Sequence, residues 1–354
     1  MMLGTVRNMQ RTRKKILLIM LCLLFLFISL EILVRLFWEP QIRTYEKGML
    51  IKDNDAGFAL KPGFEGYILG KTGEDLKIPV KINSKGLRDD EANYTKPANF
   101  RRILALGDTI TFGMRVPYDE TSMRLLEKNL SNEGYRVEII NLAVPAYDHQ
   151  QEYIRYKTEG YKYSPDIVLI IVAMNDILPS DIESLKRTFD LYQDFYVPDK
   201  PSEVLIKKVC QSCVFLYSLY YNRHAGFTNR GYLRHVYSQW DNETAWNDYS
   251  SALLNFNSEL KSQNRTLLIA MYPYIIQMDG DENYGRLPQK KMAMLANENN
   301  ITFIDVAPSL NNEKYKEFFT PEGKAASWKG HKKIAEEILA KLKEKGILIS
   351  QVHK

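Results

Sequence analysis

The 354-residue sequence predicts an α/β protein with three layers and a parallel sheet, preceded by one N-terminal transmembrane helix. Two observations carry this prediction. Short apolar runs that end in glycine or polar residues alternate with amphipathic stretches, which is the pattern of a parallel sheet covered by helices on both faces. Ahead of them, residues 16–38 form one long apolar segment that can cross a bilayer.

The segment 16–38 is the predicted anchor, and as a helix it would span roughly 34 Å. Glu31 and Arg35 stand four positions apart near its far end, where they can form an ion pair. Five basic residues precede it, so residues 1–15 are expected in the cytoplasm and the body outside the cell membrane. A cleaved signal peptide is the alternative, but no small-x-small cleavage site follows the apolar run.

The charge distribution argues against a nucleic-acid partner. The net charge is +5, and residues 1–40 supply +4 of it through six basic and two acidic side chains. The rest of the chain is therefore close to neutral, at +1, without the basic excess that nucleic-acid binding needs. We expect the membrane to be one partner, and we expect no cofactor and no metal.

The chain has three cysteines. Cys22 lies within the apolar segment, where we expect it to serve in packing. Cys210 and Cys213 form a C-x-x-C pair, which we interpret as a local disulfide of an oxidising compartment. A redox-active or zinc-binding role is the less favoured alternative, because neither a thioredoxin-like context nor two further ligands stand nearby.

The body divides into a turn-rich lead-in at 39–100 and an α/β domain at 101–346, interrupted at about 181–250 by an aromatic-rich stretch that we interpret as a helical insertion. The lead-in contains short strand-like pieces such as 78–82. Strands are expected at 102–106, 137–141, 167–173, 267–271 and 302–306. Helices are expected at 121–133, 150–160 and 330–345.

Three of these strands end in polar signatures: Gly107-Asp108-Thr109, Asn141-Leu142-Ala143-Val144-Pro145-Ala146-Tyr147 and Ala173-Met174-Asn175-Asp176. Together they resemble the blocks Gly-Asp-Ser, Asn-x-Gly-x-Pro-Gly-Tyr and Gly-x-Asn-Asp of the SGNH (GDSL-type) esterases. The segment 82–88, Ile-Asn-Ser-Lys-Gly-Leu-Arg, is similar to the lead-in of membrane-anchored bacterial members. The resemblance covers 57–180 well and 265–345 loosely.

The resemblance implies an SGNH-like domain and ester hydrolysis or acyl transfer. Thr109 would hold the nucleophile position, directly after Asp108. The N–H groups of Thr109 and Ala143 and the side-chain amide of Asn175 would form the oxyanion hole, which stabilises the negative oxygen of a tetrahedral intermediate.

Two positions depart from the family pattern. Thr109 replaces the serine, and its extra methyl group crowds a tight turn. When the fourth block, Asp-x-x-His, is aligned through Gly330-His331, Glu322 takes the aspartate position and Ala325 the histidine position. A hydroxyl without a base is a weak nucleophile. The residues that could replace the lost base are His331, Lys324 and His149.

Three functions therefore compete. The first is an active esterase or acyltransferase on acylated cell-surface polysaccharide. The second is a degenerate relative that binds such a ligand in the old cleft. The third is a non-catalytic component of an envelope assembly that binds envelope proteins. The fold favours the first, whereas Thr109 and Ala325 favour the other two.

Overall fold

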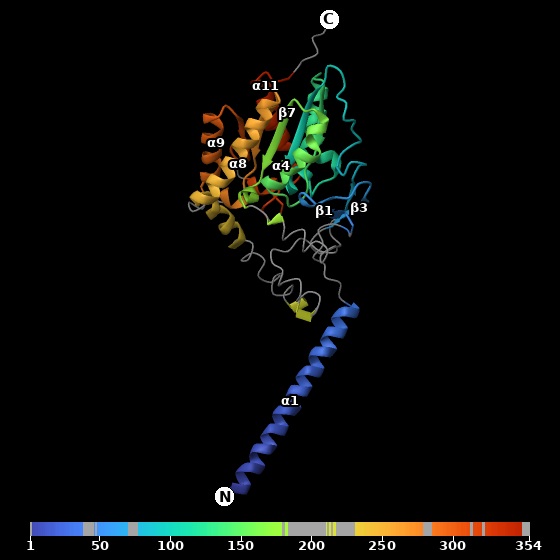
Figure 1. The fold of residues 1–354 in the computed structure, drawn as a ribbon, viewed down its shortest axis with the longest axis vertical. Coiled ribbons are helices and arrows are strands. Elements are labelled where there is room, and N and C mark those ends of the chain that lie inside the picture. Colours follow the sequence, from blue (N-terminus) through green and yellow to red (C-terminus); the bar gives the residue numbers. More distant parts are fainter. Residues whose placement is uncertain are drawn as a thin grey trace.

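The chain folds into one long N-terminal helix and an α/β body (Figure 1). The coordinates are those of a computed structural model. The structure describes residues 2–37, 46, 48–69, 77–178, 181–182, 210, 212–213, 215–216, 231–278, 285–311, 314–320 and 323–348.

Helix α1, Met2–Phe37, contains the apolar segment, and its stretch from Thr12 to Phe37 is long and apolar enough to cross a membrane. None of that stretch is buried against the body. The Arg35 guanidinium donates to Glu31 Oε1 at 2.7 Å, so the predicted pair is present. Length and composition fit both a membrane anchor and a signal sequence.

The lead-in is more regular than the sequence predicts. It forms two antiparallel hairpins, the first from β1 (Leu50–Asp53) and β2 (Gly57–Leu60), the second from β3 (Glu65–Leu69) and β4 (Lys77–Lys81). Their apolar side chains form one cluster with Phe112, Val144 and Tyr147 of the α/β domain. The lead-in therefore packs against the segments that follow β5 and β6, and it is part of the body.

The main sheet has five parallel strands in the order β6-β5-β7-β8-β9. They are β5 (Arg101–Gly107), β6 (Val137–Asn141), β7 (Ile167–Val172), β8 (Thr266–Met271) and β9 (Thr302–Asp305). Each lies within one residue of its expected range. In Figure 1 the carboxyl ends of the strands lie on the side of the body that faces α1.

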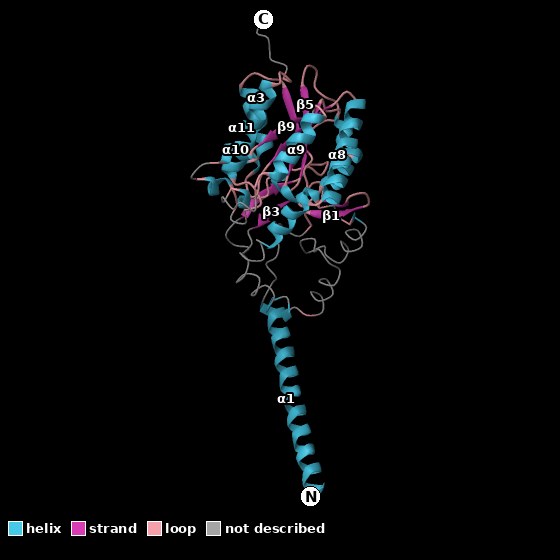
Figure 2. Cartoon of the chain, turned by 90° about the vertical axis from the view of Figure 1, so that its left-hand side faces the viewer, coloured by secondary structure: helices cyan, strands magenta, loops and turns pink. Residues whose placement is uncertain are grey.

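Helices cover both faces of the sheet, giving the three layers (Figures 1 and 2). Alternate residues of β7 show the division, since Val168 and Ile170 enter one apolar cluster and Leu169 and Ile171 the other. The first face is covered by α4 (His149–Thr158), α8 (Glu243–Ser262) and α9 (Leu287–Glu298), the second by α3 (Ser122–Asn132) and α11 (Trp328–Glu344). Shorter helices are α2 (Thr109–Phe112) and α10 (Ala307–Leu310), with 3-10 turns at Tyr118–Glu120, Gly160–Tyr163, Met174–Ile177, Ile275–Gln277 and Tyr315–Phe318.

The predicted helical insertion ends earlier than 250. Helix α8 begins at Glu243 and buries Tyr249, Leu253 and Phe256 against the sheet, so it is the crossover helix between β7 and β8. A second helix covers 231–241, and its Trp240 donates from the indole N–H to Met174 O at 2.8 Å. The stretches 183–209 and 217–230 of the predicted insertion lie outside the described residues.

The predicted disulfide is present between Cys210 and Cys213. Within the same turn, Ser212 donates from its N–H and its hydroxyl to Glu31 of α1, at 2.8 and 2.6 Å. The turn therefore contacts the end of α1 that precedes the body.

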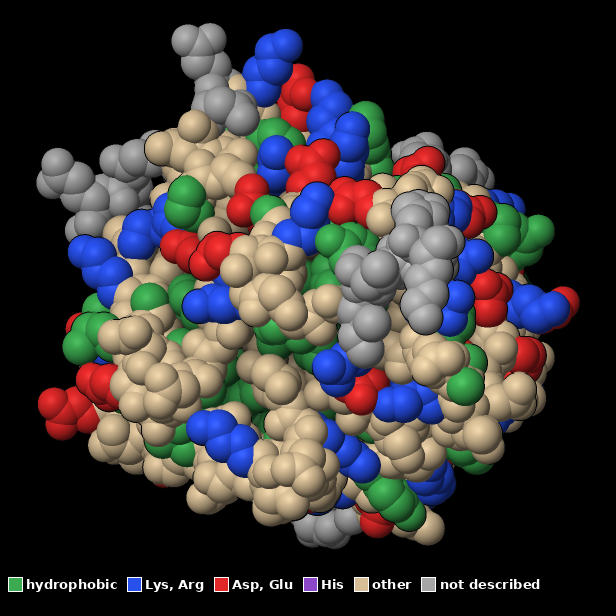
Figure 3. All heavy atoms as spheres, turned by 90° about the horizontal axis from the view of Figure 1, so that it is seen from above, with side chains coloured by type: hydrophobic (Ala, Val, Ile, Leu, Met, Phe, Trp, Pro, Cys, Tyr) green, Lys and Arg blue, Asp and Glu red, His purple; other side chains and the backbone are tan. Residues whose placement is uncertain are grey.

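Figure 3 views the body from the end opposite to α1, where Lys and Arg side chains are interspersed with Asp and Glu. Lys343 of α11 pairs there with Glu133, which follows α3, at 2.8 Å. Among the described residues on this face, neither charge dominates.

We predict that Gly330→Ala destabilises the protein. In the first turn of a helix alanine is normally favoured over glycine by about 0.5–1 kcal/mol. At Gly330, however, a Cβ would lie 2.3 Å from Phe318 O and 2.5 Å from the Tyr272 hydroxyl. Overpacking of this kind costs roughly 1–3 kcal/mol. Thermal unfolding of the detergent-solubilised chain measures the loss. Gly231→Ala, with no heavy atom within 4 Å, is the control, and equal melting temperatures for both variants would contradict the prediction.

Candidate functional site

The first block forms a tight turn at the carboxyl end of β5. Gly107 has a φ of 151°, and a Cβ there would lie 1.9 Å from Thr111 Oγ1, so only glycine fits. Asp108 follows as the N-cap of α2, its buried carboxylate accepting from the Ile110 N–H at 3.0 Å. Thr109 is the first residue of α2 and is partly exposed.

The second block is tied to the first through Asn141, the last residue of β6. Its Nδ2 donates to Thr111 O of α2 at 3.0 Å, and its Oδ1 accepts from the Ala143 N–H at 3.1 Å. The Val144 N–H also donates to Gly107 O at 3.3 Å. The turns after β5 and β6 are thus held side by side.

The third block reaches the same place from β7. Asn175 follows β7, which pairs in parallel with β5, and its side chain lowers the pKa of the buried Asp108 carboxyl group, while Asn175 Oδ1 accepts from the Tyr274 hydroxyl at 2.7 Å. This confirms that Thr109, Ala143 and Asn175 converge at one edge of the sheet, although up to 66 positions separate them. Tyr274, which follows β8, is a member of this network that the sequence analysis missed.

The expected oxyanion donors are arranged differently from the prediction. Ala143 is absent from the residues with positive φ, as the prediction required, but its N–H is directed to Asn141 Oδ1. The Thr109 N–H and the Asn175 side chain lower the pKa of the Asp108 carboxyl group. One of the three expected donors, the Ala143 N–H, is therefore hydrogen-bonded inside the protein.

A donor that the sequence did not indicate lies next to Thr109. The Ala146 N–H donates to Thr109 Oγ1 at 3.3 Å, the one hydrogen bond of that hydroxyl among the described residues. Ala146 has a φ of 64°, a left-handed conformation that costs a non-glycine residue roughly 1–2 kcal/mol. The pattern that the second block resembles has glycine at this position. The strained backbone of Ala146 therefore lies directly beside the Thr109 hydroxyl.

Four buried carboxyl groups surround the back of this turn: Asp108, Asp148, Glu152 and Asp176. Burial raises the pKa of Asp108 to about 6, and it raises the pKa values of Glu152 and Asp176 well above their usual range, with repulsion among the acids adding to the effect. No described group hydrogen-bonds to either oxygen of Glu152. Burial and mutual repulsion therefore favour the protonated forms of Glu152 and Asp176.

His149 lies in this cluster with its Nδ1 held by a backbone carbonyl, which leaves Nε2 as the acceptor nitrogen of the ring. Its Nδ1 is 2.6 Å from Asp176 O, and since a carbonyl only accepts, Nδ1 carries the proton. Burial lowers the pKa of His149, so the ring is neutral. Tyr153 and Tyr249 pack edge-on against it.

His331 contributes to helix packing and does not take the role of a base that the sequence analysis considered for it. It is 1% exposed, and its Nδ1 accepts from the Ser122 N–H at the start of α3, at 3.2 Å. Burial lowers the pKa of His331 to about 3. A neutral ring that accepts a backbone N–H between two helices fastens α11 to α3.

The fourth block lies beside the third. The Ile275 N–H donates to Gly323 O at 2.9 Å, next to Tyr274, so the loop that carries Ala325 reaches the edge where Asn175 lies. The Lys324 ammonium is 4.3 Å from the ring centre of Tyr232, an interaction that favours the charged form of the lysine over the free base. Glu322 lies outside the described residues, so its role stays a prediction.

We predict that Glu152→Gln flattens the pH dependence of stability. A carboxyl group with a raised folded-state pKa stabilises the fold below its ordinary pKa, and this contribution is lost as the pH rises through the folded-state value. For Asp108, with a pKa of about 6, the loss amounts to about 3 kcal/mol. Glutamine resembles the protonated acid. The variant should therefore melt near the wild-type temperature at pH 5 and above it at pH 8.

Glu159→Gln is the control for this measurement. Against the effect of burial, hydrogen bonds from Lys162 and Tyr94 hold the pKa of Glu159 below its usual range. Its contribution is therefore present at both pH 5 and pH 8 and is lost only as the pH falls below the ordinary glutamate value, so Glu159→Gln should cost about the same at both pH values. The same pH dependence in the Glu152→Gln variant and the wild type would show that Glu152 is ionised in the folded protein.

No protein-family model and no curated protein matches this chain. Solved structures are similar at low identity. TesA is 11% identical over 69% of this chain and 99% of its own, with a TM-score of 0.44. A G-D-S-L family lipolytic protein from Desulfitobacterium hafniense is 16% identical over 68% of this chain and 99% of its own, with a TM-score of 0.42. A lipase/acylhydrolase from Enterococcus faecalis is 14% identical over 72% of this chain and 100% of its own, with a TM-score of 0.44. At identities this low, the activity of these proteins cannot be assigned to this chain. The body has the three-layer α/β fold with a parallel sheet that the sequence predicts.

Proposed function

We propose that this chain is a membrane-anchored, extracytoplasmic SGNH-like protein that binds acylated cell-surface glycan and turns over esters only weakly. The observation that carries the proposal is the environment of the Thr109 hydroxyl. Its hydrogen bond comes from the Ala146 N–H, a donor, and a donor cannot remove a proton from it. The hydroxyl stands at the correct place of an esterase site without an activating base.

The three residues that could replace the base support this reading. None of the three hydrogen-bonds to the Thr109 hydroxyl among the described residues. The Nδ1 of His149 contacts Asp176 O, His331 is buried against α3, and the Lys324 ammonium lies over Tyr232. What remains is a set of polar groups at the carboxyl ends of parallel strands, where ligands of open α/β sheets bind. The location outside the membrane and the family resemblance motivate acylated glycan as the ligand class.

A non-catalytic, partner-binding role in an envelope assembly is the second candidate. The contact between the disulfide turn and α1 favours it, because Ser212 donates twice to Glu31 close to the expected membrane surface. A partner that recognises this junction would need the anchor and the body together.

The location of the body is tested by a topology measurement. Basic residues ahead of the apolar segment place residues 1–15 in the cytoplasm. We expect the C-terminus to lie outside the cytoplasm. A reporter that works only outside the cytoplasm should therefore be active when it is fused after Lys354. Mass spectrometry of the purified chain should recover the peptides of residues 1–15. A soluble species that begins near residue 40 would show instead that α1 is a cleaved signal sequence.

Weak turnover is tested with activated aryl esters and the detergent-solubilised full chain. Serine proteases that lose a triad member keep roughly 10³–10⁴-fold acceleration over water, which most ester assays do not resolve. We expect a rate barely above background and little change in Thr109→Ala. The double variant Thr109→Ser with Ala325→His should gain about 10²-fold, the usual contribution of a general base.

Each single restoration is the control, and it should do much less, because nucleophile and base act as a unit. Brisk hydrolysis by the wild-type chain that Thr109→Ala abolishes would contradict the proposal. It would require a base that the described residues do not show beside Thr109.

A further inference from the structure

The lead-in places two adjacent charged side chains, Arg88 and Asp89, against the turns that carry the candidate site. Arg88 is 2% exposed and donates to three backbone carbonyls. Its Nη1 contacts Phe112 O at 3.0 Å and Gly113 O at 2.6 Å, and its Nη2 contacts Val116 O at 2.9 Å.

The carbonyls of Phe112 and Gly113 are those of the last residue and the C-cap of α2, the four-residue helix that begins at Thr109, and Val116 lies three residues further along the chain. The last carbonyls of a helix have no partner within it, and in so short a helix they are a large share of its backbone acceptors. Gly113 ends the helix in a left-handed conformation, with a φ of 78°. The planar guanidinium of Arg88 fits several acceptors at once, so it fixes the path of the chain leaving the nucleophile turn.

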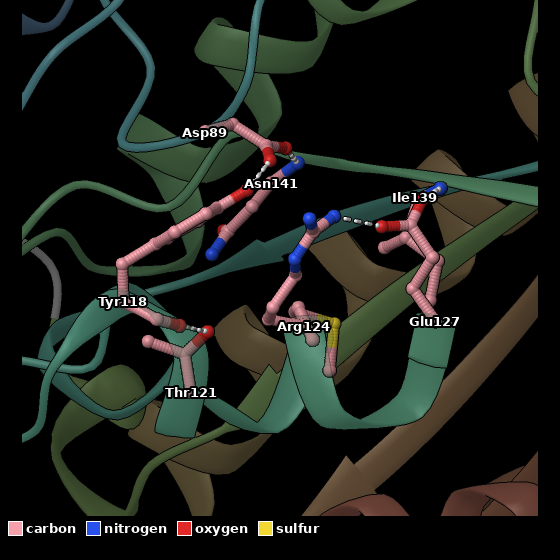
Figure 4. Close-up of a pocket in the computed structure, with 8 residues that line it drawn as sticks. Asp89, Tyr118, Thr121, Arg124, Glu127, Ile139 and Asn141 are labelled. Carbon is pink, nitrogen blue, oxygen red and sulfur yellow. Dashed lines mark hydrogen bonds and ion pairs between the residues drawn. The ribbon is translucent and has the colours of Figure 1, made fainter. Parts of the chain in front are cut away.

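Asp89 holds the start of the turn that follows β6, as an acceptor of hydrogen bonds (Figure 4). Its Oδ2 accepts from the Asn141 N–H at 2.8 Å and its Oδ1 from the Tyr118 hydroxyl at 2.7 Å. Asn141 in turn holds Thr111 O and the Ala143 N–H through its side chain. One carboxylate therefore supports the asparagine that joins the first two blocks.

We propose that Arg88 and Asp89 are positioning residues of the candidate site, which fix the turns at 108–116 and 141–147 from the lead-in. This rests on the proposed function for what those turns do. The partners of both residues lie in or beside the two turns, and the pairing of the five-stranded sheet uses neither side chain. Their loss should loosen the site more than the sheet.

A matched control exists at the opposite end of β5. Arg102 is also fully buried, and its guanidinium also donates to backbone carbonyls, those of Tyr94, Tyr163 and Asn93 at 2.8, 2.5 and 3.0 Å. Both Arg102→Met and Arg88→Met remove a buried guanidinium that holds backbone carbonyls, and Arg102→Met also removes an ion pair with Glu138, so it is the more severe of the two changes. Only one of those places touches the candidate site.

The test is amide hydrogen exchange of the detergent-solubilised full chain, measured by mass spectrometry. Relative to the β7 peptide 167–172, Arg88→Met should speed exchange in 108–116 at least tenfold, and Arg102→Met should leave that ratio unchanged. Arg88→Lys keeps the charge but lacks the planar fork, so it should give an intermediate ratio. If Arg88→Met does not fold, the lysine variant carries the comparison.

Asp89→Ala should speed exchange in 141–147, because it removes the acceptor of both the Asn141 N–H and the Tyr118 hydroxyl. Asp90→Ala, at an exposed neighbour, is its control. Equal loosening by Arg88→Met and Arg102→Met, or no change in 141–147 for Asp89→Ala, would overturn the proposal. The measurement needs no ester turnover, so its outcome is independent of the catalytic test.

Discussion

The Asn141 side chain joins the turns after β5 and β6, and the rest of the site depends on it, because its Nδ2 donates to Thr111 O at 3.0 Å and its Oδ1 accepts from the Ala143 N–H at 3.1 Å. The Tyr274 hydroxyl joins the turns after β7 and β8 by donating to Asn175 Oδ1 at 2.7 Å. Asp108 caps α2 and sets the place of Thr109. The parallel pairing of β5 with β7 brings these two pairs of turns to one edge of the sheet.

This arrangement lowers the free energy of unfolding, because it buries carboxyl groups that a turn with a purely structural role would not bury. Asp148, Glu152 and Asp176 are buried beside Asp108, and the desolvation of carboxyl groups is expensive unless they keep their protons. Raised pKa values in such a cluster are typical of functional sites, although ion networks with a structural role share them. The left-handed Ala146 adds local strain next to Thr109. The features of a prepared site are therefore present without a base beside the hydroxyl.

The Gly330-His331 pair has a structural role at the start of α11. Gly330 allows Phe318 O and the Tyr272 hydroxyl to approach the start of α11 closely. His331 gives a neutral acceptor to the Ser122 N–H, which would otherwise lack a partner at the buried beginning of α3. Neither task requires the residue at 325 to be histidine, so the helix can stay in place while the base is absent.

The sequence by itself determined the layers, the strand positions and the meeting of Thr109 and Asn175, because hydrophobic periodicity is local and parallel strands end at one edge. Only the tertiary structure decided how the polar groups are used. The partner of His331 is 209 positions away, and those of Arg88 are 24 to 28 positions away, distances over which periodicity carries no information. The direction of the Ala143 N–H depends on the backbone angles of one turn and on the Asn141 side chain. The residue types determine which hydrogen-bond donors and acceptors are available, but the tertiary packing determines which of them form hydrogen bonds with each other.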